Sequence, residues 1–399
     1  MTLRLLFVLI ISTLLLSCGK KPDQEYVPTD TLGIDSTLIE DDSIELVSYQ
    51  PYQDTLLDFT GRYLAGLSQS ESNFFAGMED DKYWQEYRLM MDSSWARMSR
   101  DRLDKMRDWE ESHLRSQIND TLPVFYPFSG PDFLHAQQIF PNTKKFVLAA
   151  LEPIIELPRI DTMTVKERDE YLDTLASSLR DIFKRSYFIT THMTKDFKKV
   201  KGVLPLLYVF TERSGYELLD TKFIYIDSLG AEQEVEASKQ HWNKTPGVKI
   251  ALRERTTKEI KTLYYFSISI SNQGLKERPE FDLFIKNLGP VNTFVKSASY
   301  LMHVPYFTEI KKMIFTQSQS IFQDDTGIPY RDFKKNKDWS VTLYGEYVKP
   351  VKDFGDEKFQ TDLDSAYKTG KKEPLPFSLG YHWGTDKQNY MLIKKIKGK

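Results

Sequence analysis

Apolar and aromatic side chains recur every three to four positions between residues 83 and 109, which is the spacing of one helix face. Such a stripe would also suit a surface that stacks on a ligand, but at helical spacing these side chains usually pack into a core. We therefore predict a helical layer with a buried apolar face. The stripe consists of Tyr83, Trp84, Tyr87, Met91, Trp95, Met98, Met106 and Trp109.

The stretch that follows predicts a strand, a helix and a second strand. Val124 to Tyr126 is a short apolar strand, Ser129 and Gly130 form a turn, and Pro131 suits the first turn of a helix. Phe146 to Leu151 is a second buried strand. Two strands joined by a helix within about thirty residues are typical of a parallel crossover unit.

The rest of the chain predicts further helices and strands. A long helix is expected from Thr162 to Arg185, with Thr162 or Thr164 as its cap. The polar stretch from Gln233 to Trp242 is expected to be a surface excursion. Two more helices are expected at 281–288 and 307–318, and strands at 218–226, 248–253, 263–270, 341–347 and 390–393.

These elements predict an α/β fold with a mostly parallel central sheet, a helical N-terminal layer and an antiparallel addition in the C-terminal half. We expect one large domain over residues 51–399, with the helical layer at 51–120 and the α/β core at 121–399. In open sheets of this kind, ligands bind beyond the carboxyl ends of the strands. Any pocket is therefore expected near residues 128–132 and Glu152.

The first seventeen residues have the pattern of an export signal. Arg4 precedes an apolar run from Leu5 to Leu16. This run is too short to span a bilayer, because a membrane-spanning helix needs roughly 20 residues. Ser17 and Cys18 follow, and this pattern resembles a bacterial lipoprotein signal peptide (1–17). The resemblance implies cleavage before Cys18 and acylation of that residue. Several acyl chains make a stable anchor, whereas one chain alone is marginal.

Residues 18–50 are rich in acidic side chains and poor in periodic apolar positions, which is typical of a flexible tether. The whole chain has a net charge of -3, which argues against a nucleic-acid-binding surface. We expect a lipid-anchored protein of the cell envelope, located at the outer membrane. Its expected partners are the membrane, reached through the lipidated Cys18, and an envelope protein or glycan.

Ser129, Asp132 and His135 form the first candidate for chemistry, because a hydroxyl, a carboxylate and an imidazole can make a catalytic triad. The alternative is structural. Asp132 can bond the free N–H groups of a helix start, where an acidic residue is favoured, and His135 can pack. Ser129 also lacks the turn sequence that exposes a hydrolase nucleophile.

The same segment resembles the opening of class I methyltransferases, in which a glycine-bearing turn holds the methyl donor. In those enzymes an acidic residue at the end of the second strand binds the ribose of the donor. The resemblance implies that Gly130 would face such a donor and Glu152 its ribose. Pro131 and Asp132 stand where those enzymes have a second small residue, so a shared fold is expected rather than the shared activity.

Asp324 and Asp325 form the third candidate, with Arg331 close by and His303 some twenty residues earlier. Paired carboxylates can hold a divalent cation, and an arginine can bind an anionic group. The alternative is a turn in which the two aspartates cap backbone groups and Arg331 pairs with one of them. The six histidines show no metal-ligand spacing, so no metal site is predicted, and no cofactor is identified.

Five phrases of the sequence resemble an uncharacterised group of exported bacterial lipoproteins of the Bacteroidetes type. The resemblance covers most of the chain from about Tyr83 and implies no activity. We expect a protein that binds a ligand or an envelope partner; the alternative is an envelope hydrolase of polysaccharide or peptidoglycan, with Asp132, Glu152 and Asp324 at its site. The phrases are YPFSGPDF (126–133), LEP (151–153), LYYF (263–266), KSASYL (296–301) and QDDTGIPYR (323–331).

Overall fold

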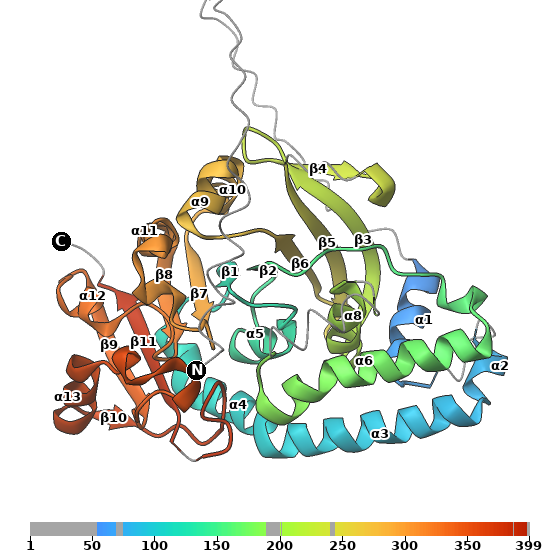
Figure 1. Cartoon of the computed structure of the whole chain (residues 1–399), viewed down its shortest axis with the longest axis horizontal. Coiled ribbons are helices and arrows are strands. Elements are labelled where there is room, and N and C mark those ends of the chain that lie inside the picture. The colour runs from blue at the N-terminus through green and yellow to red at the C-terminus, as the bar shows by residue number, and fades with distance from the viewer. Residues whose placement is uncertain are drawn as a thin grey trace, which may run out of the picture. The chain divides into compact units, whose positions relative to one another are not determined.

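An eleven-stranded mixed sheet runs through the part of the chain that the structure describes (Figure 1). The structure, a computed structural model, describes residues 54–68, 75–188, 200, 202–239, 244–385 and 387–396. The expected signal peptide, the lipidation site Cys18 and the expected tether lie outside these residues. Among the described helices, none combines the length and the apolar character needed to cross a bilayer.

The centre of the sheet consists of five parallel strands in the order β6, β2, β1, β7, β8. Along the chain, β2 and β6 are added on one side of β1, and β7 and β8 on the other. The direction of winding therefore reverses between β1 and β7. The five strands are β1 (Val124–Pro127), β2 (Lys145–Ala150), β6 (Ile260–Ser267), β7 (Val291–Val295) and β8 (Ser318–Gln323).

Antiparallel pairing extends the sheet on both flanks. Beyond β6 lie β5 (Thr245–Glu254), β3 (Tyr216–Ile226) and β4 (Glu232–Val235). Beyond β8 lie β11 (Asn389–Lys395) and β9 (Trp339–Gly345), which β10 (Lys372–Glu373) joins in parallel. The expected mixed α/β class is confirmed. Its arrangement is matched in part, since the antiparallel strands form two flanks and not a single addition.

One group of helices packs on the face of the sheet to which Tyr126 and Leu148 point. The stripe predicted in the N-terminal layer is confirmed there, because Trp84, Tyr87 and Met91 are buried. The group comprises α1 (Thr55–Leu64), α2 (Ala76–Glu79), α3 (Lys82–Met98), α4 (Asp104–Trp109), α5 (Phe133–Ile139), α6 (Val165–Arg185) and α8 (Leu204–Arg213). Short π- and 3₁₀-turns continue α3 and α4 to residue 117.

A second group of helices covers the opposite face, where Phe125 and Val147 are buried. Neighbouring residues of β1 and β2 thus serve different cores, as expected for side chains that alternate across a strand. The group comprises α9 (Asn272–Glu277), α10 (Pro279–Asn287), α11 (Thr308–Gln317), α12 (Tyr330–Lys334) and α13 (Thr361–Thr369).

Two local expectations need correction. The polar stretch after residue 232 is not only a surface excursion, since it begins with the edge strand β4. Pro131 does not lie in the first turn of α5, because Asp132 is the cap of that helix and its side chain accepts a hydrogen bond from the His135 N–H. The prediction that Thr164 caps the long helix α6 is confirmed by a reciprocal bond with Glu167.

Candidate functional site

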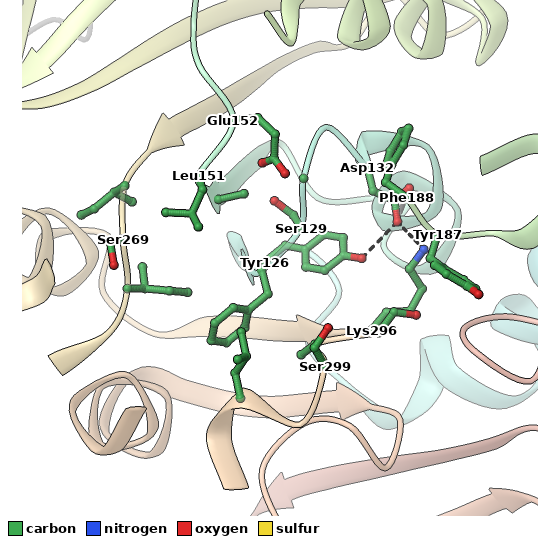
Figure 2. A pocket seen from close by; sticks show the side chains of 18 of the residues that line it. Tyr126, Ser129, Asp132, Leu151, Glu152, Tyr187, Phe188, Ser269, Lys296 and Ser299 are labelled. Carbon is green, nitrogen blue, oxygen red and sulfur yellow. Dashed lines mark hydrogen bonds and ion pairs between the residues drawn. The ribbon is translucent and has the colours of Figure 1, made fainter. Parts of the chain in front are cut away.

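A cavity of about 210 Å³ opens where the winding of the sheet reverses (Figure 2). Most of its wall comes from the carboxyl-terminal ends of β1, β2, β6 and β7 and the residues that follow them, so it lies at the carboxyl ends of the parallel strands. This is the place where open α/β sheets bind their ligands. Ser129, Gly130, Asp132 and Glu152, which the sequence indicated as ligand-binding candidates, all line it.

Aromatic and aliphatic side chains make up most of the cavity wall, and a few polar groups are set among them. Such a lining is typical of small-molecule sites, where apolar contacts supply affinity and the polar groups supply orientation. The aromatic residues are Tyr126, Phe128, Tyr187, Phe188, Phe307 and Tyr381. The aliphatic residues are Ala150, Leu151, Ile268, Ile270, Ala298 and Leu301.

Left-handed backbone conformations concentrate at this cavity. Phe128 after β1 has a φ of 60°, and Ser297, Ser299 and Tyr300 after β7 have φ values of 53°, 51° and 55°. A residue with a side chain adopts this region at a cost and retains it only where its surroundings hold it there. Strain of this kind is common at functional sites, and here it shapes two neighbouring walls of one cavity.

Glu152 lies directly beyond β2 and turns its carboxylate toward the cavity (Figure 2). The Tyr265 hydroxyl donates a hydrogen bond to Glu152 Oε2 at 3.0 Å and fixes the direction of the side chain. Burial raises the pKa of Glu152, although the bond from Tyr265 opposes this change. A carboxylate held in this way can accept hydrogen bonds from a ligand hydroxyl.

Ser129 and Gly130 form the turn between β1 and α5. The Ser129 hydroxyl is buried at the cavity and has no hydrogen-bond partner among the described residues. Gly130 has a φ of +54°, which favours glycine, and a Cβ at this position would approach Phe188 at 3.6 Å. The turn thus places this unpaired, buried hydroxyl at the wall of the cavity.

Asp132 and Lys296 form a buried ion pair at the back of the cavity, with Lys296 Nζ 2.6 Å from Asp132 Oδ2 (Figure 2). Tyr126 donates to the same oxygen at 3.0 Å, and His135 Nδ1 lies 2.8 Å from Oδ1. Burial alone would raise the pKa of Asp132, but His135 and Lys296 lower it to about 2. Both Asp132 oxygens are therefore engaged within the protein.

His135 does not complete a catalytic triad. Burial lowers its pKa to about 4, and its Nε2 atom has no partner in the described part of the chain. The Ser129 hydroxyl also has no partner among the described residues. A triad would need a hydrogen bond between Ser129 as nucleophile and His135 as base, and these two residues do not form one. The structural alternative for Asp132 and His135, a helix cap and a packed imidazole, matches their surroundings.

The sequence did not single out Lys296 as a site residue, although it directly follows the buried strand β7 and lines the cavity. It is 3% exposed, and burial lowers its pKa. The signal that could have identified Lys296 was a lysine directly after a buried strand, where ligands bind in sheets of this class. Its partner could not be read from the sequence, because Asp132 lies 164 positions earlier.

Asp324 and Asp325 follow β8 and lie outside the cavity lining. Both are buried. Asp324 accepts hydrogen bonds from the N–H groups of Ser297 and Thr326, as expected for a residue that caps a turn, whereas the Asp325 carboxylate bonds to the side chains of Tyr300 and Asn389.

The expected pairing of Arg331 is wrong, because its guanidinium is mostly exposed and lies 3.9 Å from Asp332. Arg331 and His303 line a separate surface hollow, and burial lowers the pKa of His303 to about 4.

Among the described residues, no three His, Cys, Asp or Glu side chains gather in a way that would hold a metal ion. The seven acidic, histidine and arginine candidates for chemistry lie in three places: Asp132, His135 and Glu152 in or behind the cavity, Asp324 and Asp325 beyond β8, and His303 and Arg331 at the surface hollow. No protein family, no curated protein and no solved structure matches the chain.

Proposed function

We propose that this protein binds a nucleoside or a small ligand that contains one, in the cavity at the carboxyl ends of β1 and β2. The observation that carries the proposal is the place of Glu152. It lies just beyond the end of β2, lines the cavity at the point where the winding reverses, and follows the Gly130 turn by 22 residues. In nucleotide-binding sheets of this order, an acidic residue about 20 positions after the glycine turn binds ribose hydroxyls.

The other walls suit the rest of such a ligand. Leu151, Ile268 and Ile270 lie at the ends of the neighbouring strands β2 and β6 and offer apolar surface for a flat base. The unpaired Ser129 hydroxyl lies on the turn that faces Glu152 across the cavity (Figure 2). A cavity of about 210 Å³ is small beside the roughly 300–1,000 Å³ of many ligand pockets, which favours one nucleoside over a dinucleotide.

The geometry favours binding over the alternative of an envelope hydrolase. A glycosidase of the common kind needs two carboxyl groups on either side of the scissile bond. Asp132 is committed to Lys296, Tyr126 and His135, and Asp324 lies outside the cavity, so Glu152 has no free carboxylate partner among the described lining residues. A methyltransferase-like fold without that activity is compatible with the same cavity.

We further propose that the protein performs this function at the cell envelope, held by a lipid on Cys18 and separated from the membrane by the acidic stretch 18–50. Its ligand would then be an extracytoplasmic nucleoside or a nucleoside-bearing conjugate. An envelope protein or glycan remains the proposed macromolecular partner. The short apolar run before Cys18 and the Leu-Leu-Ser-Cys pattern support this location.

Calorimetric titration of the full-length chain in detergent with adenosine, cytidine, uridine and free ribose tests the binding proposal. We expect Glu152→Gln to weaken nucleoside binding by about 10- to 100-fold, because a hydrogen bond to a charged group contributes roughly 1.5–3 kcal/mol. Glu156→Gln, four positions later on the same loop and outside the cavity lining, is the matched control and should bind normally.

The pH dependence gives a second readout of the same site. Because burial raises the pKa of Glu152, its charged form is lost earlier on acidification than that of an ordinary glutamate, and affinity should fall with it. Failure of every nucleoside to bind the unaltered chain would refute the proposal. Equal affinities of the Glu152→Gln and unaltered chains would refute the role of Glu152.

A further inference from the structure

The residues from Ser297 to Tyr300 form a strained wall of the cavity. Three of these four residues have left-handed backbone conformations, and Ser297, Ala298 and Ser299 line the cavity directly. A left-handed residue with a side chain costs on the order of 1–3 kcal/mol, and such a conformation persists only when other contacts hold it. The wall therefore needs external support to keep the cavity in shape.

That support comes from the end of β8, within the QDDTGIPYR phrase. Asp324 Oδ2 accepts a hydrogen bond from the Ser297 N–H at 2.8 Å. The Thr326 hydroxyl oxygen accepts one from the Ala298 N–H at 2.7 Å. The Tyr300 hydroxyl donates to Asp325 Oδ2 at 2.6 Å. Three consecutive residues of one turn thus hold both ends of the wall.

Asp324 is the centre of this clamp. Its second oxygen, Oδ1, accepts from the Thr326 N–H at 3.0 Å and from the Thr326 hydroxyl, and this directs the hydroxyl oxygen toward Ala298. The ionised carboxylate accepts all three bonds. A proton on Oδ2 would compete with the bond from the Ser297 N–H, and a proton on Oδ1 would turn away the Thr326 hydroxyl proton that Oδ1 now accepts. The protonated side chain therefore loses at least one of the three bonds.

The surroundings of Asp324 bring this proton exchange closer to neutral pH than for an ordinary aspartate. Burial raises the pKa of both Asp324 and Asp325, and the charge of Asp325 raises that of Asp324 further, so the pair takes up its first proton at a higher pH than an isolated carboxyl would. Lys296 is the nearby buried cation, and it is already paired with Asp132. Titratable groups from several other elements also face the two aspartates. They come from β1, β11, the strained wall, the loop before β11, the segment after β9, α13 and the 3₁₀-turn after β7, and they are Tyr126, Tyr390, Tyr300, Tyr381, His382, Tyr347, Tyr367 and His303.

We propose that Asp324 is a positioning residue for the ligand cavity, and that its protonation releases the wall from Ser297 to Tyr300 and weakens ligand binding. The inference rests on the proposed function for its binding consequence, but the state of the wall can be measured without any ligand. The wall should be held above neutral pH, where Asp324 is charged, and released as the pH falls through the range in which Asp324 takes up its proton.

Hydrogen–deuterium exchange of the full-length chain between pH 5.5 and 8, corrected for the intrinsic exchange rate, tests the clamp directly. We expect the protection of amides 297–300 to fall at least tenfold toward pH 5.5 in the unaltered chain. Asp324→Asn, which cannot ionise, should show weak protection at every pH. Asp338→Asn removes an exposed carboxylate and should behave as the unaltered chain does.

Adenosine titrations over the same pH range test the consequence for binding. Because Glu152 also titrates, the change in affinity with pH is compared between the unaltered chain and Asp324→Asn. We expect the affinity of the unaltered chain to fall several-fold more than that of the variant as the pH decreases. If Asp324→Asn does not fold, Thr326→Val replaces it, since it removes the acceptor of the Ala298 N–H and should loosen the wall at all pH values.

The outcomes separate the two proposals. Protection that does not change with pH in the unaltered chain, or that still changes in Asp324→Asn, overturns the clamp whether or not a nucleoside binds. If no nucleoside binds but the protection of the wall still depends on pH through Asp324, the clamp is supported and only the nucleoside-binding proposal is refuted.

Discussion

Lys296 carries its ammonium group into the interior at the point where β7 ends. The group is 2.6 Å from Asp132 and also donates to the carbonyl of Ser186, which ends α6. Removing one partner of a buried ion pair leaves the other charge without compensation, which is far more costly than losing a surface pair. The pair therefore fixes α5, α6 and β7 relative to one another behind the cavity.

Lys296→Met should lower the free energy of unfolding by about 3–5 kcal/mol, because Asp132 would remain buried without its cation. Lys286→Met removes an exposed lysine paired with Asp282 on α10 and should change stability by at most about 1 kcal/mol. Urea unfolding of both variants measures the difference. Equal losses in the two variants would show that the buried pair does not stabilise the fold.

Single residues also show where sequence reasoning reaches its limit. The capping role of Asp132 was predictable, because it depends on a helix start only a few positions away. The bonds from Lys296 to Asp132 and from Ser297 to Asp324 were not, since each joins residues that only the assembled sheet brings together. Glu152 was found because sheets of this class place ligands beyond their strand ends.

At the scale of elements, periodicity predicted seven of the eleven described strands, the buried stripe of α3 and the capped helix α6. It missed β7 and β8 in the parallel centre of the sheet, and it missed the helices α8, α9, α12 and α13. It also missed the edge strand β4, in which three of the four residues are polar and none is fully buried. It also did not predict the order of the strands. The order of the strands in the sheet depends on long-range contacts between elements, and these contacts cannot be read from the periodicity of a single sequence.

The helical N-terminal layer is joined to the sheet through Trp109 of α4. Its ring packs against Phe322 and Tyr344, and its Nε1 donates to the Pro374 carbonyl at 3.1 Å. Trp109→Ala should therefore lower the free energy of unfolding by about 3–5 kcal/mol, the usual cost of truncating a buried aromatic side chain.

Leu89→Ala on α3 is the control for Trp109→Ala, because Leu89 is 68% exposed and its truncation should cost little. Thermal and urea unfolding compare the two variants with the unaltered chain. A Trp109→Ala protein as stable as Leu89→Ala would mean that α4 contributes little to holding the layer on the sheet.

At the scale of the whole molecule, the lipid proposed for Cys18 decides where the cavity is displayed. Mass spectrometry of the protein from its native membranes should show an acylated terminus that begins at Cys18. Cys18→Ala should move the protein from the detergent phase to the aqueous phase in a detergent partition experiment. An unmodified terminus, or a variant that partitions as before, would contradict the proposed anchoring.

The walls of the cavity are far apart in the chain, since Tyr126 and Tyr381 both contribute to it. Contacts of such long range close late in folding, because the entropy of the intervening loop is lost before they form. A nascent or truncated chain that lacks its last strands therefore has no complete binding site. A ligand bound at the proposed site would then add stability only to the finished protein, by mass action, and the proposed nucleoside at saturating concentration should favour full-length molecules over partly folded ones.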